Sequence, residues 1–226
     1  MLIPIYDDNP TKTFPWVTIS LIVANALIFF YMLSLDFRSE ELGRFVMTFG
    51  VVPQDIEATL GTGGLVGGAT LTLFTSMFLH AGWLHISGNM LYLWVFGNNI
   101  EDHLGHLGFL LFYLAAGVAG SLAHIYFNSG SPIPSIGASG AIAGVLGAYL
   151  ILYPRARVVT AVVIIIIIRL VSLPAIVVLG LWIVFQLFSG IASVGAEGGG
   201  VAWWAHIGGF AVGLIVALVL RKPLTG

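Results

Sequence analysis

The sequence contains no cysteine, and only 8% of its 226 residues are charged. The absence of cysteine excludes disulfides, thiolate metal sites and cysteine nucleophiles. Soluble domains contain about 25% charged residues, whereas hydrophobic residues make up 58% of this chain. A soluble core cannot absorb this much apolar surface, so the composition predicts a polytopic membrane protein. The net charge of −2 argues against nucleic acid as a partner.

Apolar runs predict an all-α bundle of six transmembrane helices in a single domain that comprises residues 1–226. A spanning helix needs about 20 mostly apolar residues. The candidate runs are residues 16–35, 84–100, 107–127, 138–153, 174–188 and 201–220. The polar segment 1–15 lacks the pattern of a signal peptide, so we interpret it as an N-terminal tail and the first run as a retained span.

Two segments do not match a simple span. Residues 36–79 form a long loop that is charged in its first half and rich in Gly and Thr in its second half. We expect this loop to associate with the membrane, and an additional span within its second half is an open alternative. Residues 158–168 are strongly apolar but too short to cross a membrane before Arg169, so we expect an interfacial or re-entrant segment.

The basic residues predict the orientation, because cytoplasmic loops of membrane proteins contain an excess of Lys and Arg. Six spans place both termini on one side of the membrane. If that side is the cytoplasm, only Arg38 and Arg44 lie outside. The inner basic residues are then Lys12, Arg155, Arg157, Arg169, Arg221 and Lys222. We therefore predict a multi-pass protein of the plasma membrane, with cytoplasmic termini and the 36–79 loop outside.

Polar residues gather near the outer ends of the second, fourth and sixth spans. His85 and Asn89 lie in the first turns of the second span, Ser139 in the first turn of the fourth, and His206 in the second turn of the sixth. At ~1.5 Å rise per residue, each lies within roughly 10 Å of the outer end of its helix. A lone Ser or His in a span commonly packs against its neighbours. Four polar residues at one depth instead predict a functional site.

These residue types suit hydrolysis by a serine nucleophile. Ser139 can attack, and His206 can take its proton because a histidine titrates near neutral pH. His85 and Asn89 are four residues apart on one helix face, and with the backbone N–H of Ser139 they can donate hydrogen bonds to an oxyanion. No acidic third member is evident, since Glu197 lies beyond a glycine run. We therefore expect a Ser–His dyad.

A zinc site is the alternative function for the histidines, because His residues four apart on a helix suit zinc. The residue four after His85 is Asn89, and His80 lies five residues before His85. The spacing therefore does not favour a metal site. Three further histidines are expected to be interfacial or packing residues: His103, His106 and His124.

Glycines predict a close approach of the fourth and sixth spans. Gly140 and Gly144 form one GxxxG pattern, and Gly209 and Gly213 form another. Small residues let helix backbones approach closely in membranes. A hydrogen bond between the serine and the histidine needs such an approach.

Three motifs resemble those of the rhomboid family of intramembrane serine proteases. They are HAGWLHISGNM (80–90), GASGAIAG (137–144) and AHIGGF (205–210), in this order on the second, fourth and sixth spans. The likeness covers most of the chain, including the long first loop. Such a protease has six transmembrane helices, uses no cofactor, and cleaves transmembrane proteins within or beside their membrane-spanning helix. Its active site opens to water from the outer side.

The resemblance also implies roles for individual residues. Ser139, with Gly137 and Gly140 beside it, matches the nucleophile, and His206 matches the base. The residues that match the oxyanion-stabilising pair are His85 and Asn89, while His80 matches a supporting histidine and Glu101 a structural glutamate at the inner end of the second span.

Two features depart from many members of the family. The 36–79 loop has no Trp–Arg pair, and Ala143 stands where an aromatic residue commonly stacks on the histidine. These departures leave open how the loop is anchored and how firmly His206 is held. The alternative functions are an inactive rhomboid-like adaptor and a transporter that binds its substrate at the polar cluster. Transporter sites lie near the midplane of the membrane, so a shallow site on one side favours hydrolysis.

Overall fold

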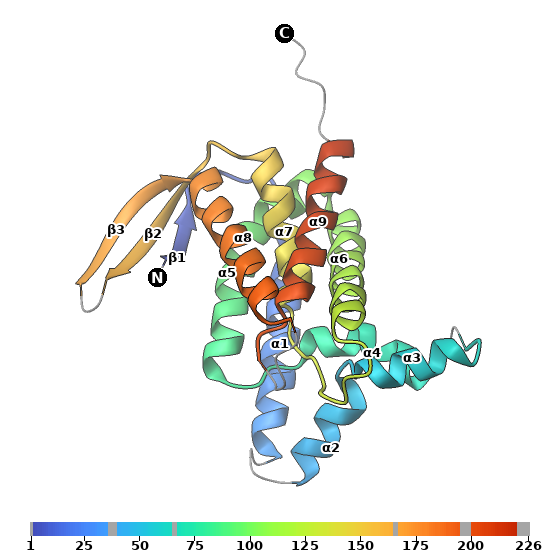
Figure 1. Cartoon of the computed structure of the whole chain (residues 1–226). Helices are drawn as coiled ribbons and strands as arrows, with labels where there is room; N and C mark the ends of the chain where they lie inside the picture. Colours follow the sequence, from blue (N-terminus) through green and yellow to red (C-terminus); the bar gives the residue numbers. More distant parts are fainter. Residues whose placement is uncertain (1, 36–39, 65–66, 165–166, 195–199, 221–226) are drawn as a thin grey trace.

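The computed structural model describes residues 2–35, 40–64, 67–164, 167–194 and 200–220. Its main feature is a helix bundle (Figure 1). The bundle helices are α1 (Trp16–Ser34), α5 (Trp83–Leu104), α6 (His106–Phe127), α7 (Ser139–Leu152), α8 (Ala175–Ala192) and α9 (Trp203–Leu220). Each coincides with one of the predicted apolar runs, so the predicted membrane helix bundle is confirmed. Among the described residues, α1, α6, α8 and α9 are long and apolar enough to span a membrane.

Helix α7 lies in the interior of the bundle. Its residues 140–149 are all buried, and it contacts α5, α6, α8 and α9. Its 14 residues rise about 21 Å, which is less than the ~30 Å of a hydrocarbon core. The surrounding helices shield α7 from lipid, so the length of α7 need not match the bilayer.

Glycines bring α7 and α9 into direct backbone contact. A methyl group added at Gly209 would overlap the carbonyl oxygen of Gly140, and one added at Gly213 would overlap the carbonyl oxygen of Gly144. The two predicted GxxxG patterns therefore face each other, and the predicted close approach of these helices is confirmed. Because both helices begin at the same end of the bundle (Figure 1), the contact aligns their first turns.

Short helices occupy the long loop between α1 and α5. They are α2 (Glu40–Phe49), α3 (Pro53–Gly61), α4 (Gly68–Thr75) and the 3₁₀ helix η1 (Ser76–Phe78). None of these has more than 10 residues, whereas a spanning helix needs about 20. The described part of the loop therefore contains no additional span.

A three-stranded antiparallel sheet extends from the bundle and was not predicted. Strand β2 (Arg157–Ile164) pairs with β3 (Ile167–Pro174) along one edge and with β1 (Leu2–Asp7) along the other. The segment at 158–168, for which we expected an interfacial or re-entrant position, forms strands in its described residues. Its run of Val, Ile and Thr favours extended backbone, since β-branched side chains are stiff and fit a pleated surface. The N-terminal tail contributes the edge strand β1.

Candidate active site

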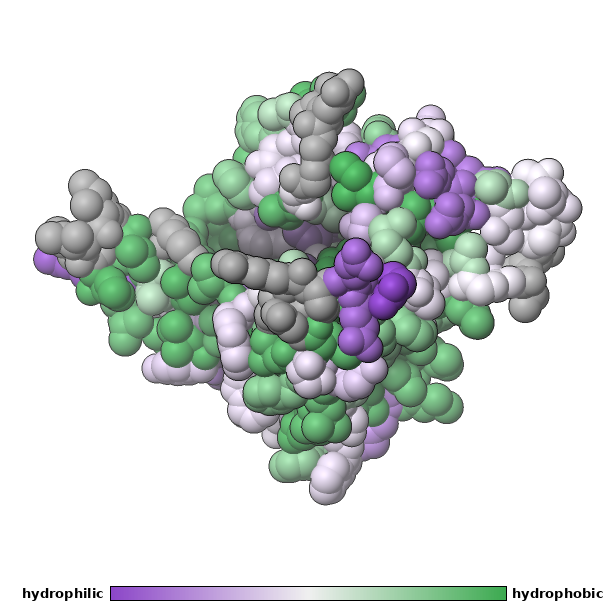
Figure 2. All heavy atoms as spheres, turned by 90° about the horizontal axis from the view of Figure 1, so that it is seen from below, coloured by the Kyte–Doolittle hydropathy of each residue, from purple (hydrophilic) through white to green (hydrophobic). Residues whose placement is uncertain are grey.

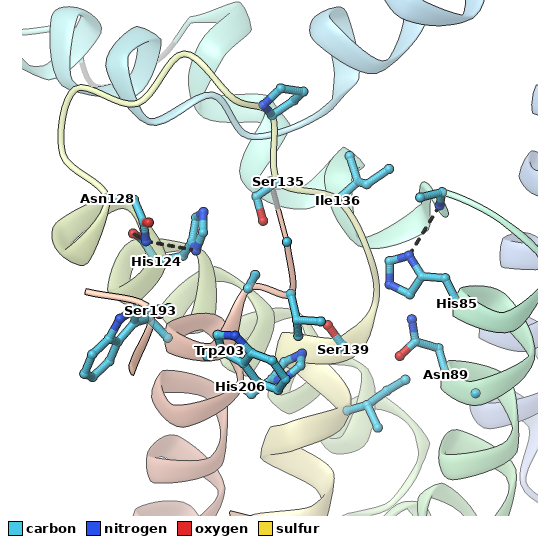
Figure 3. A pocket seen from close by; sticks show the side chains of 18 of the residues that line it. His85, Asn89, His124, Asn128, Ser135, Ile136, Ser139, Ser193, Trp203 and His206 are labelled. Atoms are coloured by element: carbon cyan, nitrogen blue, oxygen red, sulfur yellow. Dashed lines mark hydrogen bonds between the residues drawn. The ribbon is translucent and has the colours of Figure 1, made fainter. Parts of the chain in front are cut away.

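A cavity of about 850 Å³ lies at the end of the bundle where α5, α7 and α9 begin. Four of the predicted site residues line it: His85 and Asn89 from α5, Ser139 from α7 and His206 from α9. In Figure 3, Ser139 lies between His206 on one side and the α5 pair on the other. Figure 2 views the molecule from this end and shows a hollow in the surface. The structure thus brings together residues that are far apart in the sequence.

Ser139 is the first residue of α7, and a glycine makes its position possible. Gly137 has a φ of +126°, a backbone conformation that residues other than glycine rarely adopt. A Cβ at this position would also lie 2.6 Å from Nε2 of His85. The N–H of Gly137 donates to the carbonyl oxygen of Ser76 over 2.8 Å. Gly137 therefore lets the chain pass beside His85 before α7 begins. The first N–H groups of α7 have no acceptor within the helix.

The side chains of His85 and Asn89 offer hydrogen-bond donors in the cavity. The backbone N–H of Ala81 donates to Nδ1 of His85 over 3.3 Å. Because a neutral imidazole has one donor and one acceptor nitrogen, this contact places the proton of His85 on Nε2. Asn89 is only 8% exposed, and within the described structure its Nδ2 has no hydrogen-bond partner. Two donors on one helix face are suited to stabilise a developing negative charge.

His206 is held by a buried amide and two indole rings. Its Nδ1 lies 2.7 Å from Oε1 of Gln186 on α8, and both residues are buried. An amide oxygen can only accept, so Nδ1 has the proton and Nε2 retains its lone pair. The ring centroids of Trp182 and Trp203 lie 5.8 and 6.2 Å from that of His206. These contacts hold His206 in place although Ala143 provides no aromatic ring.

In the described structure, Ser139 and His206 share the cavity without a direct hydrogen bond within 3.5 Å. In ligand-free enzymes, hydrogen bonds between catalytic groups are often long and shorten only when substrate binds. The two side chains line one cavity, so a substrate bound there could contact both.

Comparison with known proteins identifies the family. The family model described as "Rhomboid domain" matches residues 67–223. The chain belongs to the rhomboid family. It is 33% identical over 220 residues to Rhomboid protease GluP of Bacillus subtilis (strain 168), which covers 97% of this chain and 37% of that protein. It is 30% identical over 165 residues to the mitochondrial Rhomboid protein 1 of Saccharomyces cerevisiae, with 68% of this chain and 43% of that protein covered.

A plant relative shows similar coverage. RHOMBOID-like protein 1 of Arabidopsis thaliana is 32% identical over 155 residues, which cover 61% of this chain and 39% of that protein. The chain thus spans less than half the length of each of these three relatives. Family membership and the apolar helices make this rhomboid an integral membrane protein.

Hydrogen bonds anchor the 36–79 loop of this rhomboid, although the loop lacks the Trp–Arg pair. Val51 and Ser135 exchange hydrogen bonds of 3.0 and 2.7 Å, which join the 36–79 loop to the segment before α7. The N–H of Gly130 donates to a carboxylate oxygen of Glu57 over 3.0 Å. The loop is therefore tied directly to the chain that leads into Ser139.

Two further histidines lie close to the site. His80 is fully buried, and its ring stacks edge-on against that of His85 at 4.9 Å. Burial, with a smaller contribution from His85, lowers the pKa of His80 to about 3, so this residue is neutral. His124 was expected to be an interfacial or packing residue. It lines the cavity beside Asn128, whose amide nitrogen lies 3.3 Å from Nδ1 of His124.

The other predicted residues lie elsewhere. Gly140 packs α7 against Ala205 of α9. Glu101 lies at the far end of α5, fully buried, where it accepts hydrogen bonds of 2.7–2.8 Å from the N–H groups of Val17 and Thr18 and from the hydroxyl of Thr18. Its carboxylate therefore caps the N-terminus of α1 in place of a local capping residue. Glu197, considered as a third catalytic member, lies outside the described residues.

The other two histidines lie at that same far end. Nδ1 of His106 contacts the Glu101 carboxylate at 2.5 Å, and the His103 ring lies 6.5 Å from that of Tyr153. Neither residue lines the cavity.

Proposed function

We propose that this rhomboid is an intramembrane serine endopeptidase that cleaves membrane-anchored proteins in or near their transmembrane helix. The observation that supports this proposal is the shared cavity. The cavity combines a serine at the start of a helix, a histidine whose Nε2 is available, and the side-chain N–H donors of His85 and Asn89. Each of these groups matches one requirement of acyl transfer through a serine nucleophile.

In the proposed mechanism, Oγ of Ser139 attacks the carbonyl carbon of the scissile peptide and Nε2 of His206 takes its proton. The oxyanion that forms accepts hydrogen bonds from Nε2–H of His85, from Nδ2–H of Asn89 and from the backbone N–H of Ser139. The protonated His206 then donates to the leaving amine, and an ester to Ser139 remains. Water activated by His206 hydrolyses this ester and restores the serine.

The substrate is proposed to be a transmembrane helix that unwinds easily near its outer end. A carbonyl inside an intact helix is bonded to an N–H four residues on, and an unpaired polar group in lipid costs several kcal/mol. A Gly or Pro lowers that cost, because these residues have helix propensities about 1 and 3 kcal/mol worse than Ala. Cleavage should therefore follow a small residue such as Ala and lie upstream of a helix breaker.

We propose that the chain lies in the plasma membrane with both termini in the cytoplasm. The orientation of the termini follows from the distribution of Lys and Arg along the chain. It directs the cavity toward the outer side, where water for hydrolysis is available.

A fluorophosphonate probe tests the activity directly, because it reacts with activated serines. The full chain, purified in detergent, should gain one covalent adduct at Ser139 by mass spectrometry, and Ser139→Ala should gain none. The wild type should also cut membrane-anchored peptides in liposomes, whereas His206→Ala should not. A wild type that neither reacts with the probe nor cuts any peptide would mean that the cavity only binds its ligand, as in an inactive adaptor or a transporter.

A further inference from the structure

We propose that Gln186 is a positioning residue that fixes the tautomer and the orientation of His206. This inference rests on the proposed function, in which His206 is the general base. Gln186 has no part in the sequence motifs and does not line the cavity. It acts on the reaction only through the histidine, with which it shares a hydrogen bond of 2.7 Å.

The position of Gln186 is unusual for a side chain of its kind. It is the only amide side chain of α8, a helix that the structure describes in full and that is otherwise almost entirely apolar. Gln186 is 4% exposed. Burying an amide is unfavourable unless it is hydrogen-bonded, and here the amide oxygen lies 2.7 Å from Nδ1 of His206. The buried amide of Gln186 therefore contacts the proposed base, His206, directly.

The contact selects one of the two neutral forms of the imidazole. An amide oxygen at Nδ1 requires the proton to be on that nitrogen, which leaves the lone pair of Nε2 available to take a proton from a serine. In the other tautomer, Nε2 would have the proton and could not act as a base. Hydrogen bonding at one ring nitrogen thus sets the function of the other.

The neighbouring aromatic rings cannot make this selection. Trp182 lies at 36° and Trp203 at 87° to the ring of His206. They restrict how the imidazole tilts, but an indole face offers no acceptor in the plane of the imidazole. Ala143, on α7, has only a methyl group. Among the contacts of His206 in the described structure, the Gln186 oxygen is therefore the one that distinguishes its two nitrogens.

The test compares two substitutions that differ in the acceptor. Gln186→Leu has a similar size and no acceptor, whereas Gln186→Glu keeps the acceptor and loses the donor. Because the buried hydrogen bond and the correct tautomer are both lost, Gln186→Leu should react with the fluorophosphonate probe about 10- to 100-fold more slowly. Its kcat for a transmembrane peptide should fall by the same factor with KM unchanged, because the substitution leaves the binding surface intact. Gln186→Glu should retain at least a third of the wild-type rate.

A structural role would produce the opposite order. If Gln186 only filled space, the apolar leucine would be tolerated and the buried carboxylate would be the damaging change. Val178→Ala, another buried position of α8, reports the effect of disturbing the helix alone and should keep the wild-type rate. Thermal unfolding monitored by tryptophan fluorescence shows whether each variant is folded.

The outcomes separate the inference from the proposed function. If wild type forms no adduct at Ser139, the proposed function fails. If wild type reacts and folded Gln186→Leu reacts at the same rate, or if folded Gln186→Glu is slower than Gln186→Leu, the proposed role of Gln186 is wrong while the function stands. Should Gln186→Leu not fold, the rate of Gln186→Glu relative to wild type decides: retention supports the acceptor, and a loss of more than about tenfold overturns it.

Discussion

Replacing Asn89 should lower the catalytic rate without changing the stability of the protein. Its Nδ2 is buried and has no hydrogen-bond partner in the described structure, so Asn89→Ala breaks no hydrogen bond of that nitrogen in the resting protein. In the proposed mechanism the same nitrogen donates to the oxyanion. Loss of one such donor costs about 10²–10³ in kcat, or about 3–4 kcal/mol. We therefore expect kcat to fall by this factor while KM and the midpoint of thermal unfolding stay close to wild type.

The assay is steady-state cleavage of a fluorescent transmembrane peptide in liposomes, with kcat and KM determined separately. Asn89→Leu is the matched control, because it removes the same N–H but restores the side-chain volume. If the missing donor causes the loss, both variants should lose kcat to a similar extent. If Asn89→Ala changes only KM, or if Asn89→Leu recovers most of the rate, then Asn89 is a binding or packing residue and the oxyanion assignment is refuted.

Four further outcomes are expected. Glu101→Ala should lower the free energy of unfolding by about 2–4 kcal/mol, since it leaves buried N–H groups of α1 without an acceptor, and the folded fraction should keep its probe reactivity. Gly209→Val should destabilise the protein and slow the probe reaction together, because it forces α9 away from α7. Burial raises the pKa of the Asp7 carboxyl, so the folded state favours its protonated form and stability falls as pH rises through that pKa. Asp7→Asn should therefore raise the unfolding midpoint at pH 7 and have little effect at pH 3. The chain has no cysteine, so an introduced cysteine is the only thiol. In intact cells, a membrane-impermeant maleimide should label Gly130→Cys and should not label Ala156→Cys. The reverse pattern would overturn the proposed orientation.

Much of the bundle could be predicted because each helix has its own local signal. Apolar runs indicate helices in lipid, and Gly140 and Gly209 indicated where two of them touch. The candidate site was also accessible, since polar residues such as Ser139 and His206 stand out against apolar surroundings. Their positions in the first two turns of the fourth and sixth predicted spans indicated their depth, and a common depth on alternate helices implied one end of the bundle.

The features that were missed depend on partners distant in the sequence. Gln186 is a visible amide in an apolar run, but nothing local indicates that His206, on the next helix, is its partner. Val51 and Ser135 anchor the 36–79 loop through backbone groups, which every residue has, so this anchor leaves no signature in the side chains. The strand pair β2 and β3 was missed because hydrophobicity alone does not separate a short apolar strand from part of a helix.

The glycine contact between α7 and α9 and the candidate active site are parts of one arrangement. Gly140 follows Ser139 directly, and Gly209 lies three residues, or just under one turn, after His206. The backbones meet here so closely that a methyl group added at Gly209 would overlap the carbonyl oxygen of Gly140. The separation of the two helix axes is therefore set within one turn of both proposed catalytic residues. A close-packed contact of this kind deforms little, whereas a hydrogen bond between two side chains would tolerate considerable movement. The small residues thus define the distance between serine and histidine, and Gln186 and the two tryptophans then only have to orient the imidazole within it.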